Sequence, residues 1–416
     1  MVAKSEAVDA PKHFNPEPFA YHHELELSIE SLTNRGIGLA RADGWVVMVA
    51  FALPGEKVRA RIFRNHANYS EADLIEILCP SPDRVEPVCP LFGTCGGCQY
   101  QQLSYPAQLS WKQSQVAESL EKIGGIVAPV LPPIPSPKEY GYRSKITPHY
   151  QRWREDGDFP IGFLKVSQRQ RLVDVPACPI ATPAINQELP DLREKVRSTP
   201  PKGKKKKGAT LLLREAMEGV VTDSKELITE KVGRRIFQFK AGEFFQNNPF
   251  ILPAFAEYVV RQAAKESQVL IDTYCGSGLF SLSAAESFEK VIGIEVSSAA
   301  TQLADSNAAL NGLNNVEFLT GEAESIFSEV DRHSGKKISV VIDPPRRGCD
   351  ERFLNQLIEL SPQRIVYVSC EPSTQARDLK ILLAGGYEIE EIQPLDLFPQ
   401  TRHIENVVTL VLKEND

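Results

Sequence analysis

From residue 241 onward, short apolar runs alternate with helical patterns, and this alternation constrains the fold more than any other feature of the chain. The apolar runs predict strands at residues 269–272, 291–296, 316–320, 339–343, 364–368, 387–397 and 407–412. Apolar residues with helical spacing predict helices at residues 279–286, 299–310, 350–360 and 374–383. Strands separated by helices form a doubly wound parallel sheet, an α/β fold that binds ligands at the carboxyl ends of its strands.

The amino-terminal part follows a different pattern, in which short alternating strands are separated by glycine and proline turns. The pattern predicts strands at residues 25–29, 45–49, 57–61 and 72–77. A five-stranded OB-like β-barrel fits this arrangement, and such barrels commonly bind single-stranded RNA. A barrel with a purely structural role is the alternative. The first 22 residues contain three prolines and no periodicity, which predicts a disordered tail.

A chain of 416 residues exceeds one ordinary core, so several domains are expected. We expect four segments: a tail at 1–22, the barrel at 23–80, a central α+β domain at 81–240 and the α/β domain at 241–416. No apolar run approaches the ~18 residues of a membrane helix, and the first residues lack the apolar core of a signal peptide. The sequence therefore predicts a cytoplasmic protein with no membrane association and no obligate protein partner. Its eight cysteines are expected to be thiols, metal ligands or catalysts rather than disulfides.

Charge is distributed unevenly along the chain, although the formal net charge is -7. Residues 89–240 contain 24 Lys and Arg against 15 Asp and Glu, whereas residues 241–416 contain 14 against 26. The basic excess of the central segment predicts contact with a phosphate backbone. The run Lys202-Gly-Lys-Lys-Lys-Lys207 can also be read as a solvated loop, but the segment stays basic without those lysines.

Three motifs of the α/β domain lie where strands are predicted to end. The loop Asp272-Thr-Tyr-Cys-Gly-Ser-Gly278 follows the first strand, and Glu295 lies near the end of the second, where an acid can receive ribose hydroxyls. Asp343-Pro-Pro-Arg346 follows the fourth strand, and Ser369-Cys-Glu-Pro-Ser-Thr374 follows the fifth. A thiol at the end of a buried strand, beside a nucleotide-type loop, indicates a nucleophile that works with a bound cofactor.

These motifs resemble those of the S-adenosylmethionine-dependent RNA 5-methyluridine methyltransferases, over nearly the whole chain from about residue 24. The segment Arg35–Arg41, with Leu53-Pro-Gly-Glu56, resembles the TRAM domain, an RNA-binding barrel. The resemblance implies the seven-stranded methyltransferase version of the α/β fold, with an antiparallel last strand. It also implies S-adenosylmethionine as cofactor, with contacts from Gln246, Tyr274, Glu295, Glu322 and Asp343.

Methylation of uracil carbon 5 requires one nucleophile and one base on opposite sides of a flat ring. A thiolate that adds to carbon 6 places negative charge on carbon 5, and a base must later remove the carbon-5 proton. The motif matches make Cys370 the nucleophile and Glu405 the base, with His403 as an orienting or structural group. The helix expected after Pro372 should lower the pKa of Cys370 through its dipole.

Four other cysteines form a candidate metal site: Cys89, Cys95 and Cys98 in a C-x5-C-x2-C pattern, and Cys178 as a distant fourth ligand. Zinc prefers paired short spacings, so this pattern favours an iron–sulfur cluster. Family members with the pattern bind a [4Fe-4S] cluster. Zinc and a metal-free set of thiols are the alternatives.

Three functions remain open from the sequence. The first is an RNA uracil-C5 methyltransferase; the cysteine pattern favours rRNA as its substrate, with tRNA as the alternative. The second is an amino-group methyltransferase, but Arg346 replaces the aromatic residue of its motif and such an enzyme needs no Cys370 or Glu405. The third is a non-catalytic RNA-binding scaffold.

Overall fold

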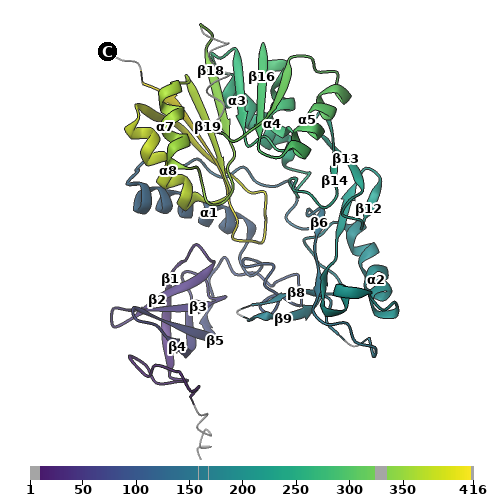
Figure 1. Ribbon diagram of the computed structural model, residues 1–416. Helices are drawn as coiled ribbons and strands as arrows, with labels where there is room; N and C mark the ends of the chain where they lie inside the picture. Colours follow the sequence, from purple (N-terminus) through teal and green to yellow (C-terminus); the bar gives the residue numbers. More distant parts are fainter. Residues whose placement is uncertain (1–9, 158, 167, 324–334, 414–416) are drawn as a thin grey trace, which may run out of the picture. The chain divides into compact units, whose positions relative to one another are not determined.

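The computed structural model describes residues 10–157, 159–166, 168–323 and 335–413 (Figure 1). The chain divides into two compact units. The first contains Met1–Trp111 and Gln400–Arg402, and the second contains Lys112–Pro399 and His403–Asp416. The central segment at 112–240 thus groups with the α/β sheet by contacts, and the domain boundaries expected at residues 80 and 240 stay predictions.

The first unit contains a closed five-stranded barrel, which confirms the predicted barrel. Its strands are β1 (Glu24–Leu32), β2 (Ile37–Ala42), β3 (Trp45–Ala50), β4 (Lys57–Asn65) and β5 (Tyr69–Cys79), in the order β1-β2-β3-β5-β4. Buried and more exposed side chains alternate along parts of these strands, as at Val58, Ala60 and Ile62 of β4. The core contains Leu27, Ile29, Val47, Val49 and Ile62, all at most 3% exposed.

The second unit is built on a seven-stranded sheet in the order β17-β16-β15-β18-β19-β21-β20. Its strands are β15 (Val269–Thr273), β16 (Lys290–Glu295), β17 (Val316–Thr320), β18 (Ile338–Ile342), β19 (Arg364–Ser369), β20 (Tyr387–Leu395) and β21 (Glu405–Leu412). The first five run parallel, and β21 inserts antiparallel between β19 and β20. This arrangement confirms the predicted methyltransferase fold. The strand order reverses between β15 and β18, where ligands of such sheets bind.

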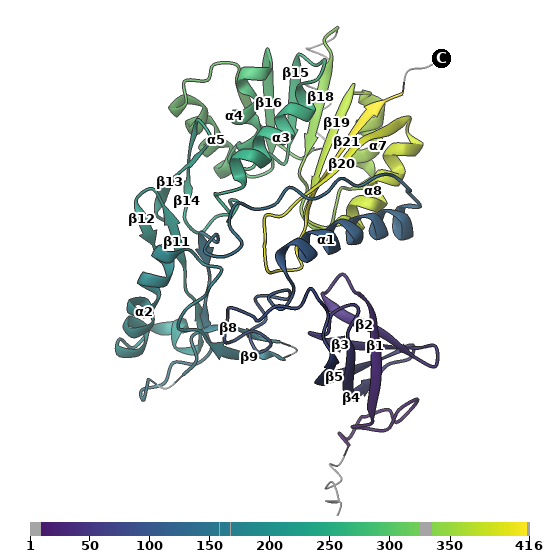
Figure 2. The ribbon, with the colours of Figure 1, turned by 180° about the vertical axis from the view of Figure 1, so that it is seen from behind.

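Helices cover both faces of this sheet (Figures 1 and 2). One face packs against α3 (Leu252–Ala264), α4 (Leu279–Ala284) and α5 (Ser298–Leu310), and the other against α7 (Glu351–Leu360) and α8 (Pro372–Ala384). Val116 of α1 (Tyr105–Ser119) and Leu120 of the following π-helical turn (Leu120–Gly124) join the α7–α8 face. Sequence patterns did not predict α1 or α3. Eight of the 13 residues of α3 are buried, and its exposed residues Ala254, Glu257 and Arg261 follow helical spacing on one face.

Small sheets form the rest of the second unit. They contain β6 (Lys145–Ile146), β7 (His149–Tyr150), β8 (Gly162–Lys165), β9 (Gln168–Asp174), β10 (Ala209–Thr210), β11 (Leu213–Ala216), β12 (Gly219–Val221) and the hairpin β13 (Leu227–Val232)–β14 (Arg235–Lys240). The helix α2 (Pro183–Ser198) packs on β11 and β12. Short 3-10 turns lie at Gly203–Lys207 and Ala285–Ser287. No helix among the described residues is long and apolar enough to cross a membrane.

Candidate active site

The loop after β15 turns sharply into α4 at the point where the strand order reverses. Tyr274, Gly276 and Gly278 have φ values of 62°, 55° and 89°, in the left-handed region. A Cβ on Gly278 would lie 2.4 Å from Leu282 Cδ1 and 3.0 Å from Phe318 Cζ, so only glycine fits there. Tyr274 is a non-glycine residue in this strained region, and such strain concentrates at functional sites.

The carboxylates of Asp272 and Glu295 accept hydrogen bonds from backbone N–H groups in this loop and next to it. The Ser281 backbone N–H and hydroxyl donate to Asp272 Oδ2 at 2.9 and 2.5 Å, and burial raises the pKa of Asp272 to about 7. The Gly276 backbone N–H donates to Glu295 Oε2 at 3.1 Å, and that of Ser297 donates to Glu295 Oε1 at 2.9 Å. The sequence motif identified Asp272 only as the first residue of the glycine-rich loop. Its buried hydrogen bonds with Ser281 could not be predicted from the distance between the two residues along the chain.

A cavity of about 730 Å³ opens beside the loop. This volume lies in the usual range for small-molecule sites, roughly 300–1,000 Å³. Its lining includes three of the predicted cofactor residues, Tyr274, Glu295 and Glu322. Carboxylate oxygens here can accept hydrogen bonds from the ribose hydroxyls and amino group of a nucleoside. Gln246 and Asp343, the other two predicted contacts, are not among the lining residues.

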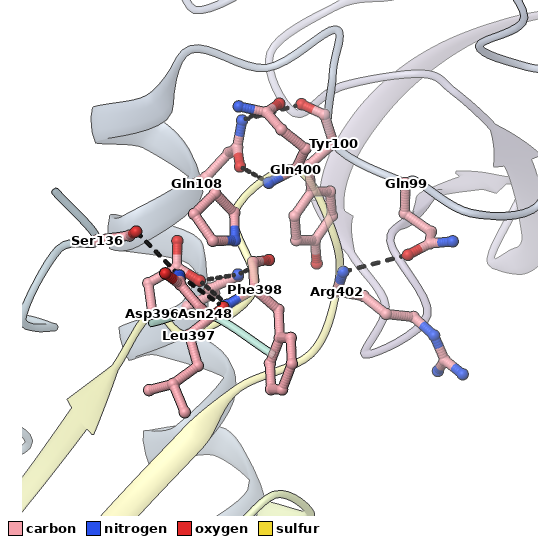
Figure 3. Close-up of polar contacts among 12 residues, drawn as sticks. Gln99, Tyr100, Gln108, Ser136, Asn248, Asp396, Leu397, Phe398, Gln400 and Arg402 are labelled. Carbon is pink, nitrogen blue, oxygen red and sulfur yellow. Dashed lines mark hydrogen bonds and ion pairs between the residues drawn. The ribbon is translucent and has the colours of Figure 1, made fainter. Parts of the chain in front are cut away.

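The neighbourhood of Gln246 is tied to the rest of the second unit by two asparagines. The Asn247 carbonyl accepts from the Ser144 backbone N–H at 2.9 Å. Asn248, 1% exposed, donates from Nδ2 to Ser136 Oγ and to the Leu397 carbonyl, both at 3.0 Å (Figure 3). The helix α3 is capped at Ile251, so Asn248 is a cross-brace between segments rather than a helix cap.

The predicted nucleophile and base lie at adjacent strand ends. In the antiparallel pairing of β19 with β21, Ser369 lies opposite Asn406, so Cys370 leaves β19 where Glu405 begins β21. Cys370 is half-buried, and Glu405 is 3% exposed. Asp343 follows β18, the neighbour of β19 on its other side. Residues distant in the sequence thus meet at one sheet edge.

The charges around Cys370 determine its proton affinity. Burial raises the pKa of the Cys370 thiol to about 11, and the carboxylates of Glu405 and Asp343 act in the same direction. The Arg346 guanidinium opposes them through its charge and a hydrogen bond. The expectation that a helix dipole lowers the pKa of Cys370 is therefore wrong, because burial and two nearby carboxylates outweigh it.

The same groups act on the two acids. Burial raises the pKa of Glu405 well above its usual range, with a further rise from Asp343 and an opposing effect of Arg346. Burial also raises the pKa of Asp343 to about 7. A carboxylate with such an affinity for protons suits a base that must hold a proton near neutral pH.

Arg346 is itself held by two contacts. Its Nη2 lies 3.2 Å from His403 Nδ1, and its carbonyl accepts from Thr374 Oγ1 at 3.1 Å. The sequence motif marked Arg346 only as a difference from the motif of amino-group methyltransferases. Its effect on the Cys370 and Glu405 pKa values makes it a member of the site. The contact of His403 with Arg346 is consistent with the orienting role expected for that histidine.

The segment between β20 and β21 leads to Glu405 and is anchored by a buried ion pair. Lys112 Nζ donates to Asp396 Oδ1 at 2.6 Å and to the Phe398 carbonyl at 3.1 Å. The two side chains are 1% and 0% exposed. Figure 3 shows this segment, including Gln400, whose N–H donates to Gln108 Oε1 at 3.0 Å within the first unit.

The predicted metal site gains no support from the structure. Within the described parts of the chain, no group of three or more His, Cys, Asp or Glu side chains is placed to hold a metal ion. Cys89, Cys95 and Cys98 belong to the first unit and Cys178 to the second. Cys178 packs against an apolar cluster that contains Ile146, Ala181, Ile185, Leu189 and Leu213. The iron–sulfur cluster stays a prediction.

Comparison with known proteins gives two family matches. Residues 211–413 match the model of tRNA (uracil-5-)-methyltransferases, and residues 23–75 match the TRAM domain. The chain is 42% identical to the Schizosaccharomyces pombe tRNA (uracil(54)-C(5))-methyltransferase, over 94% of this chain and 79% of that protein. It is 33% identical to the Saccharomyces cerevisiae enzyme of the same name, over 94% and 74%.

A solved structure is also similar over most of its length. It is the Pyrococcus abyssi tRNA (uracil-54, C5)-methyltransferase in complex with S-adenosyl-L-homocysteine, with a TM-score of 0.73 and 25% identity. The match covers 93% of this chain and all of that one.

Proposed function

Because this chain belongs to the RNA (uracil-5-)-methyltransferase family, it is an S-adenosylmethionine-dependent enzyme that methylates carbon 5 of uracil in RNA, and we propose that its substrate is a tRNA uridine. Cysteine spacing favoured rRNA. Three similar proteins are instead named for uracil 54 of tRNA, and these names support the alternative. The cytoplasmic location stays a prediction.

The meeting of Cys370 and Glu405 at adjacent strand ends is the observation that carries the proposed mechanism. The Cys370 thiolate adds to uracil carbon 6, and the charge that develops at carbon 5 allows that carbon to accept a methyl group. Glu405 then takes the carbon-5 proton, the carbon 5–carbon 6 double bond re-forms, and the thiolate leaves. Arg346 favours the thiolate form of Cys370 through its positive charge.

The cavity beside the glycine-rich loop fits the cofactor. Glu295 and Glu322 offer acceptors, and Tyr274 offers an aromatic surface, which suit a nucleoside. When bound, S-adenosylmethionine supplies an electrophilic methyl group on a sulfonium. Gln246 and Asp343 are proposed as further contacts from the motif match alone.

The substrate proposal is tested by mapping 5-methyluridine in RNA. We expect tRNA from cells lacking the gene to lose this nucleoside at position 54, with rRNA unchanged, when fragments are analysed by mass spectrometry. Purified enzyme should methylate a tRNA transcript but not a transcript with cytidine at that position. Loss of rRNA 5-methyluridine with intact tRNA would restore the rRNA assignment, and no change in either RNA would argue for a scaffold.

Basic residues of the central segment form a candidate RNA surface. The lysine run forms a 3-10 turn at Gly203–Lys207, and the Trp153 backbone N–H donates to the Lys206 carbonyl at 3.1 Å. A groove of about 890 Å³ beside it is lined by Arg152, Trp153, Arg154, Glu155, Asp156, Lys206 and Lys207. We propose that these exposed cations contact the phosphate backbone of the substrate.

Affinity for tRNA is expected to fall steeply with salt because phosphate contacts release counterions. Replacing Lys206 and Lys207 by Ala should reduce the slope of log K against log salt by about 1.4–1.8, at roughly 0.7–0.9 per contact. Fluorescence anisotropy at several salt concentrations measures this slope. The control is replacement of Lys265 and Lys336, which pair with acids elsewhere on the surface. Equal slopes for both double variants would contradict the proposed surface.

The [4Fe-4S] cluster is proposed on cysteine spacing and family resemblance alone. Anaerobically purified protein is expected to be brown, with about four irons and four sulfides per chain. Cys95→Ser should then lower the iron content and the stability more than the reactivity of Cys370. Iron-free, fully active protein, or stoichiometric zinc, would refute the cluster.

The rate of covalent addition is expected to rise with pH. The Cys370 thiol has a pKa of about 11, so its reactive thiolate fraction grows about tenfold per pH unit below that value. Arg346→Ala removes the charge that lowers this pKa, so its profile should move to higher pH and its rate at neutral pH should fall about tenfold. Single-turnover adduct formation with 5-fluorouridine RNA measures both effects. Arg352→Ala, an exposed arginine on α7, is the control.

A further inference from the structure

A pair of buried amides lies directly behind the strand ends that carry Cys370 and Glu405. Gln375, in the first turn of α8, and Asn406, in β21, are both 0% exposed. Gln375 Nε2 donates to the Tyr367 carbonyl of β19 at 2.9 Å and to the Asn406 carbonyl of β21 at 3.3 Å. Asn406 Nδ2 donates in turn to Gln375 Oε1 at 2.7 Å. One side chain thus connects both strands and a helix.

The Gln375–Asn406 pair lies on the opposite face of the sheet from the Glu405 side chain. Successive side chains of a strand alternate between faces, so Asn406 shares a face with Val408 and Glu405 shares one with Val407. Val408 packs in the cluster formed with α7 and α8, whereas Val407 packs in the cluster formed with α3 and α4. The amides therefore touch the backbone beside Cys370 and Glu405 from the face opposite to the Glu405 side chain.

The orientation of both amides is fixed by their partners. Carbonyl oxygens only accept, so Gln375 must turn its NH2 group toward the two strands and its oxygen toward Asn406. A reversed Gln375 would place its side-chain oxygen against the Tyr367 and Asn406 carbonyl oxygens, neither of which can donate a hydrogen bond. Asn406 Oδ1 has no hydrogen-bond partner among the described residues. The Asn406 side chain thus donates from Nδ2 to Gln375, while its own buried oxygen accepts no hydrogen bond from those residues.

The hydrogen bonds of Gln375 and Asn406 involve residues close in the sequence to both Cys370 and Glu405. Cys370 lies between Tyr367, whose carbonyl is bound, and Gln375 itself, while Glu405 is the immediate neighbour of Asn406. Fixing these points sets the position of the thiol relative to the carboxylate. The two groups must reach opposite faces of a uracil ring, and a shift of about 1 Å in such a geometry can reduce the rate about 10²-fold.

We propose that Gln375 and Asn406 are positioning residues that set the separation between the Cys370 thiol and the Glu405 carboxylate, an inference that rests on the proposed roles of those two residues. Gln375→Leu keeps side-chain volume but removes all three hydrogen bonds. We expect kcat per active site to fall about 10–100-fold, with KM for tRNA and Kd for S-adenosylmethionine within about threefold of wild type, because neither amide lines the proposed cofactor cavity.

Active sites are counted by the amount of covalent complex formed with 5-fluorouridine RNA at completion, so misfolded protein does not contribute to the rate. The matched control is Gln262→Leu. Gln262 is 2% exposed, and its Nε2 bonds to Tyr258 and Glu391 at the other end of the sheet from Cys370. This variant should lose stability yet keep its kcat per active site.

A double-variant cycle tests whether the pair acts as one unit. Gln375→Leu combined with Asn406→Leu should be no slower than the slower single variant, because the first change already breaks the shared contacts. Asn406→Ala is the milder test if Gln375→Leu does not fold. It leaves the bonds of Gln375 to the two carbonyls in place, so we expect a loss of about 3–10-fold.

The proposal is overturned if Gln375→Leu, or failing that Asn406→Ala, keeps kcat per active site within twofold of wild type, or if the losses of the single variants multiply in the double variant. Its failure differs from that of the proposed function. If the roles of Cys370 and Glu405 were wrong, wild-type protein would form no complex with 5-fluorouridine RNA.

Discussion

Replacing Cys370 by Ala is expected to abolish both methylation and covalent RNA binding, because the change removes the thiol that is proposed to add to uracil carbon 6. Glu405→Gln should behave differently. Attack and methyl transfer remain possible, but removal of the carbon-5 proton slows about 10²–10⁴-fold, the usual contribution of a general base. Methylated RNA should therefore accumulate on Cys370 as a slower band on a denaturing gel.

Wild-type enzyme with 5-fluorouridine RNA provides the reference for this band, because fluorine at carbon 5 cannot leave as a proton. Cys79→Ala, an exposed thiol in the barrel, is the control for loss of a cysteine and should methylate normally. Wild-type turnover by Glu405→Gln, or a trapped complex with Cys370→Ala, would show that the two roles are misassigned.

Replacing Lys112 by Met should destabilise the second unit by about 3–5 kcal/mol, because it leaves the Asp396 carboxylate buried without its partner. Burial already lowers the pKa of Lys112 despite the opposing charge of Asp396, which indicates how strongly the site is desolvated. Urea unfolding monitored by circular dichroism measures the change. Lys122→Met removes an exposed ion pair with Glu118 and should change stability by less than about 1 kcal/mol.

The double variant Lys112→Met with Asp396→Leu distinguishes an unpaired charge from lost packing. Two apolar side chains of similar size should recover much of the stability, since the pair itself is expensive to bury. A Lys112→Met variant as stable as wild type would mean that water or another group solvates Asp396. A double variant less stable than Lys112→Met would mean that packing, rather than charge, dominates.

The parallel sheet could be predicted because its central strands β15, β18 and β19 are short apolar runs buried on both faces. Helices are expected on both faces of such a sheet, because its parallel strands are joined by right-handed helical crossovers. Cys370 and Glu405 could be proposed as nucleophile and base because both lie in motifs that resemble those of the family. Strand ends that meet at one edge then place them together.

Contacts across the fold could not be predicted in the same way. Gln375 and Asn406 are polar residues without a motif, and only the pairing of β19 with β21 reveals that they meet. The pKa of Cys370 was predicted with the wrong sign because a helix start is visible in the sequence, whereas burial and neighbouring carboxylates are not. Cysteine spacing likewise says which thiols are close along the chain, but not which converge in space.

The insertion of β21 between β19 and β20 has a consequence for the order in which the enzyme is assembled. During synthesis, at about 5–20 residues per second, Cys370 is made about 2–7 seconds before Glu405, which lies 35 residues further along the chain. In that interval β20 has no β21 to pair with. Because β21 pairs with β19 on one side and with β20 on the other, β20 is joined to β19 only after β21 has been made. A nascent chain therefore contains the Cys370 thiol before it contains the Glu405 carboxylate, the proposed base. Insertion of β21 between β19 and β20 also brings Glu405 to the strand end that carries Cys370, so closure of the sheet and the meeting of these two residues are one event.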